Sequence, residues 1–282
     1  MTTSRIALTI CLIISASAAA AAQHAADFME QTAVIAKGQD TAARRHAITD
    51  SLQAAGIEYR LEEFSLPRFS GTNIVVDIPG KNALKVFLLG AHYDRVSIGE
   101  GAVDNAASCA VLLELLKEFK GNPLNNFSIR GVFFDLEEAG LVGSQAYLAS
   151  IGDKQMPADA VNLDIFGYGD TLFAAASSPE GSLAQALQRA AQETSLDVRL
   201  VEPARYPASD HRPMIAAGIE TLGLSLIDGA EIDPILQRSA QTPRILTIIH
   251  TARDTTDNIR GSDMEKAFPV LVQTIRGVDE GN

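Results

Sequence analysis

The sequence has no tryptophan and only two cysteines among its 282 residues. Cys11 lies in an N-terminal apolar stretch that we expect to be removed, which leaves Cys109 as the only thiol of the mature chain. One cysteine cannot form an intramolecular disulfide, and it cannot build a thiolate-rich zinc site. Any metal ion that this protein binds must therefore be held by nitrogen and oxygen ligands.

Positive charge is also scarce, because 23 Lys and Arg residues are outnumbered by 35 Asp and Glu residues, for a net charge of −12 at pH 7. Removal of the N-terminal stretch would take away Arg5 and no acid, so the mature chain would be more acidic still. An acidic surface argues against nucleic acid and anionic membranes as partners, and it favours solubility outside the cytoplasm.

Apolar runs long enough to cross a membrane are missing. The stretch from Ile6 to Ile14 follows Arg5 and precedes a tract of small residues, which is the layout of a secretory signal peptide. It is well short of the ~20 apolar residues that span a bilayer, and the bulky Ile10 before Cys11 disfavours a lipoprotein signal. We expect residues 1–22 to be a signal peptide, residues 23–282 to form one domain, and the protein to be periplasmic or secreted.

After this stretch the chain alternates between short apolar runs and longer amphipathic stretches. Residues 24–56 fit two short amphipathic helices. Strands are expected over 58–64, 72–79, 84–90, 128–136, 160–166, 221–227 and 244–250, and helices over 104–119, 141–151, 180–194 and 262–276. This order predicts the α/β class, as a single-domain three-layer α/β/α sandwich around a mostly parallel mixed sheet. In such sheets, ligands bind at the carboxyl ends of the strands.

Acids and histidines stand where several of these apolar runs end, and another acid begins the helix expected at 104–119. Each has an ordinary explanation when taken alone, such as a helix cap, a solvated turn or a structural histidine. Together at one sheet edge they indicate a metal site. The residues are His92, Asp94, Asp104, Glu137, Glu138, Asp164, His250 and Asp254.

Imidazoles and carboxylates without sulfur suit zinc, with manganese or cobalt as possible substitutes. Two imidazoles together with several carboxylates are more ligands than one catalytic zinc ion normally takes. They suit two divalent ions ~4 Å apart that share a carboxylate and a water. The neighbours Glu137 and Glu138 point in different directions at a strand end, so that one can bind metal while the other accepts a proton from metal-bound water.

Several motifs in this order resemble those of the secreted di-zinc aminopeptidases of the bacterial leucyl-aminopeptidase type. They are "GAHYD", "GAVDNAASCAVLLEL", "FFDLEEAGLVGS", "VNLDIFG", "SDHRPMIAAGIETL" and "HTARDT", from about Asn73 to the C-terminus. Glutaminyl cyclases and glutamate carboxypeptidases share the fold of that family. The resemblance implies the zinc-exopeptidase fold, two zinc ions, and hydrolysis of N-terminal residues from peptides by a hydroxide that bridges the two metals.

The resemblance also implies the role of each site residue. Asp104 would bridge the two ions, Glu138 and His250 would complete one site, and His92 and Asp164 would complete the other. Glu137 would be the general base. Asp94 would orient the imidazole of His92, as acids beside metal-bound histidines commonly do. Tyr206 and His211 are rival candidates for stabilising the oxyanion.

Three features depart from the family pattern near these motifs, and one of them is "DNAAS" in place of the commoner Asp-Asn-Ala-Ser-Gly. Leu136 stands where many relatives have glycine, and Met214 stands where an aromatic residue is frequent. Neither is an expected ligand, so the departures concern the specificity pocket. Cys109 shares one helical face with Leu112 and Leu116, which predicts a core position.

Other functions on the same scaffold are a glutaminyl cyclase, a carboxypeptidase and a non-catalytic binding relative. Cyclases tend to line their pocket with tryptophan, which this chain lacks. Binding relatives lose metal ligands, whereas every expected ligand is present. The leading interpretation is therefore an exported metallo-aminopeptidase acting on peptides with a free N-terminus, with the oligomeric state left open.

Overall fold

The computed structural model describes residues 22–152, 155–237 and 242–281. Residues 1–21 of the predicted signal peptide lie outside this part of the chain, and residues 22–36 are helical. Within the described ranges, none of the helices combines the length and apolar character that crossing a bilayer requires.

Eight strands form one mixed sheet in the order β1-β2-β4-β3-β5-β8-β6-β7. Its centre is parallel, because β4, β3, β5 and β8 run in one direction, whereas β2 and β6 run antiparallel to their neighbours β4 and β8. The strands are β1 Arg60–Leu66, β2 Phe69–Ile78, β3 Lys85–His92, β4 Phe127–Phe134, β5 Asp159–Leu163, β6 Thr171–Ala176, β7 Asp197–Val201 and β8 Glu220–Ile227.

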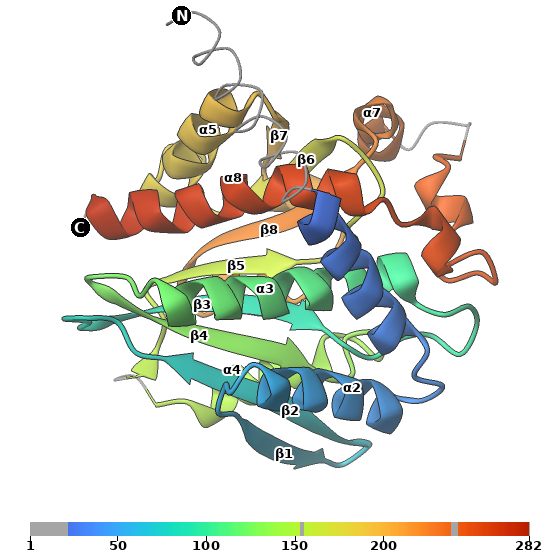
Figure 1. Ribbon diagram of the computed structural model, residues 1–282, viewed down its shortest axis with the longest axis horizontal. Helices are drawn as coiled ribbons and strands as arrows, with labels where there is room; N and C mark the ends of the chain where they lie inside the picture. Colours follow the sequence, from blue (N-terminus) through green and yellow to red (C-terminus); the bar gives the residue numbers. More distant parts are fainter. Residues whose placement is uncertain (1–21, 153–154, 238–241, 282) are drawn as a thin grey trace, which may run out of the picture.

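Helices cover both faces of the sheet, which confirms the predicted three-layer architecture (Figure 1). The residues 22–36 helix, α2, α3, α5 and α8 contribute to the larger core, and α4 and α6 contribute to the smaller core on the other face. The named helices are α2 Thr41–Ala54, α3 Ala107–Gly121, α4 Val142–Ser150, α5 Ser182–Thr194, α6 His211–Ala216, α7 Gly229–Gln237 and α8 Gly261–Glu280.

The central strands are apolar on both faces, as strands covered by two helical layers must be. In β3, Phe87 and Leu89 point into the larger core, while Leu88 between them points into the smaller one. All three side chains are fully buried. The continuous apolar run that begins at residue 84 is therefore explained by burial on two sides, and its first polar side chain, His92, comes where the strand ends.

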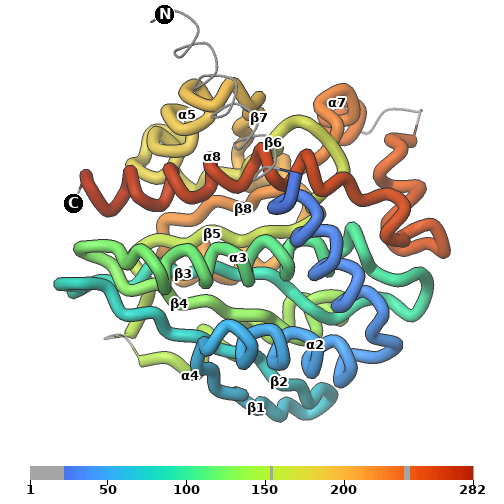
Figure 2. The backbone as a smooth tube through the Cα atoms, in the orientation of Figure 1, coloured from blue at the N-terminus to red at the C-terminus, as the bar shows by residue number. Residues whose placement is uncertain are grey.

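Residues 22–54 form two helices, as the sequence predicted for this region. Their apolar residues Phe28, Ile35, Ile48 and Leu52 are fully buried in the larger core. Figure 2 shows the chain running from the start of α8 down to α2 across the face that carries α3. These helices are thus a built-in part of the domain core.

The strand predicted over residues 244–250 is wrong. Ile245–Thr247 forms a 3₁₀ helix that ends before Ile248. Ile245 and Ile248 are buried, while Leu246 is 47% exposed. Burial every third residue matches a helical turn rather than a strand, and the apolar composition alone did not distinguish the two. Strands β6 and β7 were not predicted either. For β6 the reason is its run "TLFAAA", which is rich in alanine, a residue that is uncommon in strands.

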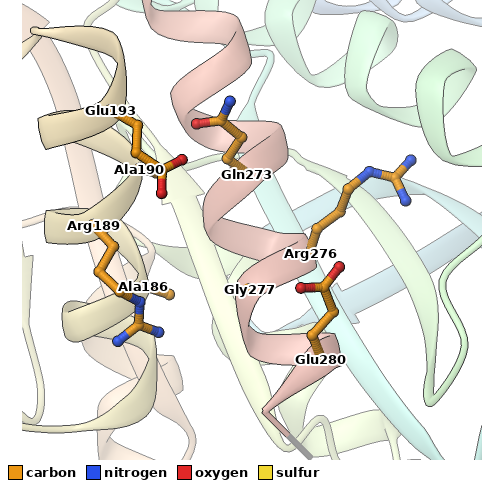
Figure 3. A pocket seen from close by; sticks show the side chains of 8 residues that line it. All are labelled: Ala186, Arg189, Ala190, Glu193, Gln273, Arg276, Gly277 and Glu280. Atoms are coloured by element: carbon orange, nitrogen blue, oxygen red, sulfur yellow. The ribbon is translucent and has the colours of Figure 1, made fainter.

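A groove of about 280 Å³ runs between α5 and α8, where Ala186, Ala190 and Gly277 let the helices approach closely (Figure 3). Arg276 extends away from α5 and donates to Glu118 Oε1 at 2.9 Å. The carboxylate of Asp279, near the end of α8, accepts hydrogen bonds from the N–H groups at the start of β4. This groove therefore lies near the amino ends of the strands, at the edge opposite to the predicted site.

Candidate metal centre

The predicted ligands meet at the carboxyl ends of three neighbouring parallel strands. His92 is the last residue of β3, and Asp164 is the first residue after β5. Glu137 and Glu138 follow β4, whose final residue Phe134 is paired with His92. Because β3 lies between β4 and β5, these side chains converge on one point of the sheet edge.

Asp104 lies at a non-helical kink within the short helical segment Ala102–Ala106 before α3, and His250 lies in the turn that follows Ile245–Thr247; both side chains reach the same point. The two oxygens of Asp104 face different partners: Oδ1 lies 3.2 Å from His92 Nε2, and Oδ2 lies 3.1 Å from His250 Nε2. His92 Nε2 is also 3.5 Å from Asp164 Oδ1, and His250 Nε2 is 3.1 Å from Glu138 Oε2. The structure thus assembles two groups of possible ligands, His92–Asp104–Asp164 and Asp104–Glu138–His250, which share Asp104.

These separations fit zinc. Bonds from zinc to nitrogen or oxygen are about 2.0–2.2 Å long, so two ligand atoms on one tetrahedral zinc ion lie about 3.3–3.6 Å apart. The four separations between imidazole nitrogens and carboxylate oxygens are 3.1–3.5 Å. Glu138 Oε1 and Asp164 Oδ1 are buried without a hydrogen-bond partner among the described residues. Buried carboxylate oxygens without donors are costly unless a cation compensates them.

The two groups differ in their access to solvent. The side chain of His92 is only 1% exposed and that of Asp164 is 14% exposed, whereas that of His250 is 52% exposed. The centre is therefore closed on the side of the sheet and open beside His250. A substrate can approach from that side.

Burial and the charges within the site shift the pKa values of His92, His250 and Glu137. The pKa of His250 rises to about 10, because Asp104 and Glu138 accept hydrogen bonds from its imidazole. Burial alone would lower the pKa of His92, but the carboxylates of Glu137 and Asp104 raise it by more. Burial raises the pKa of Glu137 to about 9, and the charges of Asp164 and Asp210 add to this rise.

These shifts lead to a prediction about zinc binding. Zinc binds neutral imidazole, so a histidine that is protonated in the absence of a cation must lose its proton first. Because the pKa of His250 is raised to about 10, zinc binding near neutral pH is expected to release at least one proton. Apparent zinc affinity should rise about tenfold per pH unit for each proton released, up to that pKa.

Titration calorimetry in two buffers of different ionisation enthalpy measures the number of protons released. A matched pH series in a chelator competition assay gives the affinities. Binding without proton release, together with constant affinity between about pH 6 and pH 9, would contradict the proposed environment of the histidines.

Asp94 lies behind the ligands and contacts three parts of the site. Its Oδ1 is 3.3 Å from His92 Nδ1 and accepts a hydrogen bond from the N–H of Glu137 at 3.0 Å. Its Oδ2 accepts from the N–H of Glu138 at 3.1 Å. One buried carboxylate thus links the imidazole at the end of β3 to the backbone that carries both glutamates.

Three residues beside or within the site have a left-handed backbone. Leu136 precedes Glu137 with φ +57°, Ile165 follows Asp164 with φ +64°, and His250 itself has φ +57°. Residues other than glycine rarely adopt this conformation, and where they do they cluster at functional sites. The positive φ of Leu136 gives a physical reason for the glycine that many relatives have at this position.

Two further acids contribute to the site. Asp254 had been noted in the sequence without a role; its carboxylate accepts hydrogen bonds from the N–H groups of Val103 at 2.7 Å and Asp104 at 3.3 Å. Asp210 was not predicted as a site residue. It is fully buried, neither carboxyl oxygen has a hydrogen-bond partner among the described residues, and burial raises its pKa to about 7. The motif "SDHRP" contained this residue but gave no physical reason to select it.

Tyr206 and His211 lie side by side, with ring centroids 5.2 Å apart. The Tyr206 hydroxyl is hydrogen-bonded to the Ser225 hydroxyl within the core. Both ring nitrogens of His211 are buried without a hydrogen-bond partner among the described residues, and burial lowers its pKa to about 4. His211 is therefore neutral near pH 7. Within the described residues, neither side chain forms a hydrogen bond or ion pair with any of the five predicted ligands.

Cys109 occupies the core position that its helical spacing predicted. The side chain is fully buried, and its thiol donates to the carbonyl oxygen of His92 at 3.1 Å. Burial raises the pKa of the thiol to about 12. It is therefore a neutral packing group below the end of β3.

A family model described as "Peptidase family M28" matches residues 73–275. The chain is 27% identical over 196 residues to "Aminopeptidase YwaD" of Bacillus subtilis (strain 168), across 66% of this chain and 39% of that protein. It therefore spans about two fifths of the length of this curated relative.

Two solved structures share the fold. The zinc aminopeptidase BSAP from Bacillus subtilis is 24% identical with a TM-score of 0.63, across 74% of this chain and 50% of that one. A glutaminyl cyclase from an Acidobacteriales bacterium is 22% identical with a TM-score of 0.72, across 92% of this chain and 95% of that one. At these identities the similarity establishes the architecture alone.

Proposed function

Because the chain belongs to peptidase family M28, we propose that it is an exported zinc aminopeptidase that removes N-terminal residues from peptides. The observation that carries this proposal is the carboxylate of Asp104, whose two oxygens face two separate groups of imidazole and carboxylate ligands. A relative that only binds peptides would have no need for two complete ligand groups around one carboxylate.

Under this proposal, His92 and Asp164 would hold one cation, Glu138 and His250 would hold a second, and Asp104 would offer one oxygen to each group. Zinc fits the donor set best, and manganese or cobalt could replace it, because all three accept imidazole together with carboxylate. When bound, such ions polarise the scissile carbonyl and lower the pKa of a water molecule to about 7.

Glu137 is the residue that moves the proton. It belongs to neither ligand group, while its backbone N–H is fixed by Asp94. A bound cation would offset the burial and the neighbouring carboxylates that raise its pKa. Its carboxylate then takes a proton from the attacking water and gives it to the nitrogen of the leaving peptide, as a general base and then a general acid.

The oxyanion of the tetrahedral intermediate needs a hydrogen-bond donor, and Tyr206 and His211 both stay candidates for this role. The neutral His211 would donate through one ring N–H. The Tyr206 hydroxyl already shares a hydrogen bond with Ser225, so it could donate to the oxyanion only while Ser225 is the donor in that bond. His211 is therefore favoured by its unpartnered ring nitrogens.

Export is part of the proposal and rests on the layout of residues 1–22, with Arg5 before a short apolar stretch. A peptidase outside the cytoplasm would meet extracellular or periplasmic peptides as substrates. The acidic composition fits this location and argues against nucleic acid as a partner.

A glutaminyl cyclase is the second candidate, and one observation favours it. This chain covers 95% of the Acidobacteriales cyclase but only 50% of the Bacillus zinc aminopeptidase. Against it stand the absence of tryptophan and the presence of two complete ligand groups. A carboxypeptidase is the third, because the metal ligands alone do not select which end of a peptide is bound.

A substrate panel tests these alternatives on the zinc-loaded protein. We expect hydrolysis of a leucine arylamide and of peptides with a free N-terminus, and at least about 10²-fold slower turnover once the α-amine is acetylated. Amidation of the C-terminus should have little effect, because the free amine is the recognised group.

Mass spectrometry of the products separates the outcomes. Release of C-terminal residues would identify a carboxypeptidase, and loss of ammonia from glutaminyl peptides without hydrolysis would identify a cyclase. Either result would overturn the aminopeptidase assignment.

A further inference from the structure

A buried arginine supports the loop that connects His92 to Asp104. Arg44 lies in α2 and is fully buried. Its Nε donates to the carbonyl oxygen of Tyr93 at 2.6 Å, Nη1 donates to that of Glu100 at 2.9 Å, and Nη2 donates to that of Gly101 at 3.2 Å. One guanidinium group thus holds both ends of a loop that lies far from α2 in the sequence.

Two glycines leave room for this side chain. A Cβ atom on Gly38 would lie 2.6 Å from Arg44 Cγ, and one on Gly101 would lie 2.9 Å from Arg44 Nη1. Gly101 also has a φ of +59°, which disfavours other residues. Any larger residue at position 38 or 101 would therefore collide with the Arg44 side chain.

The charge of Arg44 is partly offset by the acids of the site. The hydrogen-bond acceptors of the guanidinium are backbone carbonyls, which carry no full charge, and burying a charged group without compensation is costly. Burial lowers the pKa of Arg44, while the carboxylates of Asp94 and Asp104 raise it. Burial is the larger effect, so the acids offset only part of the cost of burying this charge, and the three carbonyl acceptors hold the guanidinium in place.

The positions of the three carbonyls connect Arg44 to the ligands. Tyr93 directly follows His92, and Gly101 comes three residues before Asp104. Asp254 holds the same segment from the other side through the N–H of Asp104. The loop is therefore fixed at its first residue, near its end and at the ligand itself.

We propose that Arg44 is a positioning residue of the metal centre, which keeps His92 and Asp104 at the separation that bound cations require. It acts through the backbone and touches no substrate. This inference rests on the proposed function, because it assumes that the ligand groups bind zinc. It also gives the N-terminal helices a role in the site, since Arg44 comes from the second of them.

Substitution R44M tests the proposal, because methionine keeps much of the aliphatic volume and removes the charge and all three hydrogen bonds. Zinc affinity of the folded variant is expected to fall at least about tenfold, as it does when groups that orient metal ligands are removed. The visible absorption spectrum of the cobalt-loaded protein should also change, since it reports ligand geometry rather than stability. Both measurements are made without substrate.

Substitution R130M is the matched control. Arg130 is also largely buried and donates to Asp77 Oδ1 at 2.6 Å, on the outer part of the sheet. R130M should lower thermal stability while zinc affinity and the cobalt spectrum stay those of the wild-type protein. Comparing R44M with R130M thus separates the general effect of losing a buried arginine from the specific effect of Arg44 on zinc binding.

Should R44M fail to fold, R44K decides the question, because lysine keeps the charge but cannot span three carbonyls with a planar fork. Reduced zinc affinity with an altered cobalt spectrum in R44M or R44K supports the proposal. Wild-type affinity and spectrum in a folded variant would overturn it and leave Arg44 a purely structural residue. If the wild-type protein itself binds no zinc, the proposed function fails instead.

Discussion

Substitution E137Q is expected to lower kcat about 10³-fold or more while the zinc content of the protein stays unchanged. Glutamine keeps the shape of the side chain and removes the carboxylate that would accept the proton, and general base catalysis typically contributes 10²–10⁴-fold. Glu137 belongs to neither ligand group, so its loss should not release a cation. Steady-state kinetics on a leucine arylamide and elemental analysis of the same sample measure both quantities.

The exposed Glu193 on α5 provides the control, since E193Q makes the same chemical change far from the sheet edge. Its kcat should match that of the wild-type protein. Two results would remove Glu137 from its assigned role: turnover by E137Q within about tenfold of the wild-type value, or a loss of zinc that parallels the loss of activity, which would make Glu137 a ligand.

Substitution D104N is expected to have the largest effect on the metal content. Each oxygen of Asp104 faces a different ligand group, and an amide offers only one oxygen and no charge. Zinc bound per chain should fall from two ions to one or fewer, and activity should fall at least about 10³-fold. Adding excess zinc should not restore it, whereas it should restore the wild-type enzyme after chelation.

Asp233 serves as the comparison, because it is an exposed acid paired with Arg199 on the protein surface. D233N should keep two zinc ions and full activity. Retention of both ions by D104N would mean that the two groups do not depend on a shared carboxylate, and the two-metal account would then be wrong.

The sequence could predict which side chains meet in the candidate metal centre, because parallel strands bring their carboxyl ends together. An acid or histidine that ends a buried apolar run must lie at that edge, which located His92, Glu137, Glu138 and Asp164 before their partners were known. His250 was predicted for the wrong reason, since the strand expected before it is a 3₁₀ helix. The resemblance carried by the motif "HTARDT" was the second ground for expecting it to be a ligand, and that ground does not depend on the strand.

The residues that the sequence did not reveal act across long stretches of chain. Arg44 lies on an amphipathic helix, where an arginine normally faces solvent, and only the fold brings it under the loop after His92. Asp210 lies four residues after Tyr206 in the sequence, and both residues are buried. The sequence did not show that the Tyr206 hydroxyl is hydrogen-bonded to Ser225, whereas the Asp210 carboxylate has no such partner among the described residues. Short-range patterns carry no information about such contacts.

The departures from the family pattern can now be explained in part. Leu136 adopts the left-handed backbone that glycine takes without strain, so the local conformation is kept although the residue differs. Met214 is fully buried in the smaller core, together with Phe134 and Tyr147. Met214 therefore packs in the core between the sheet and the helices α4 and α6. These contacts do not support the expectation that it shapes the specificity pocket.

The most direct test of the account is the anomalous scattering of zinc-soaked crystals measured on both sides of the zinc absorption edge. We expect two peaks per chain, one among His92, Asp104 and Asp164 and one among Asp104, Glu138 and His250. A single peak, or none between these side chains, would contradict a pair of cations held by a shared carboxylate.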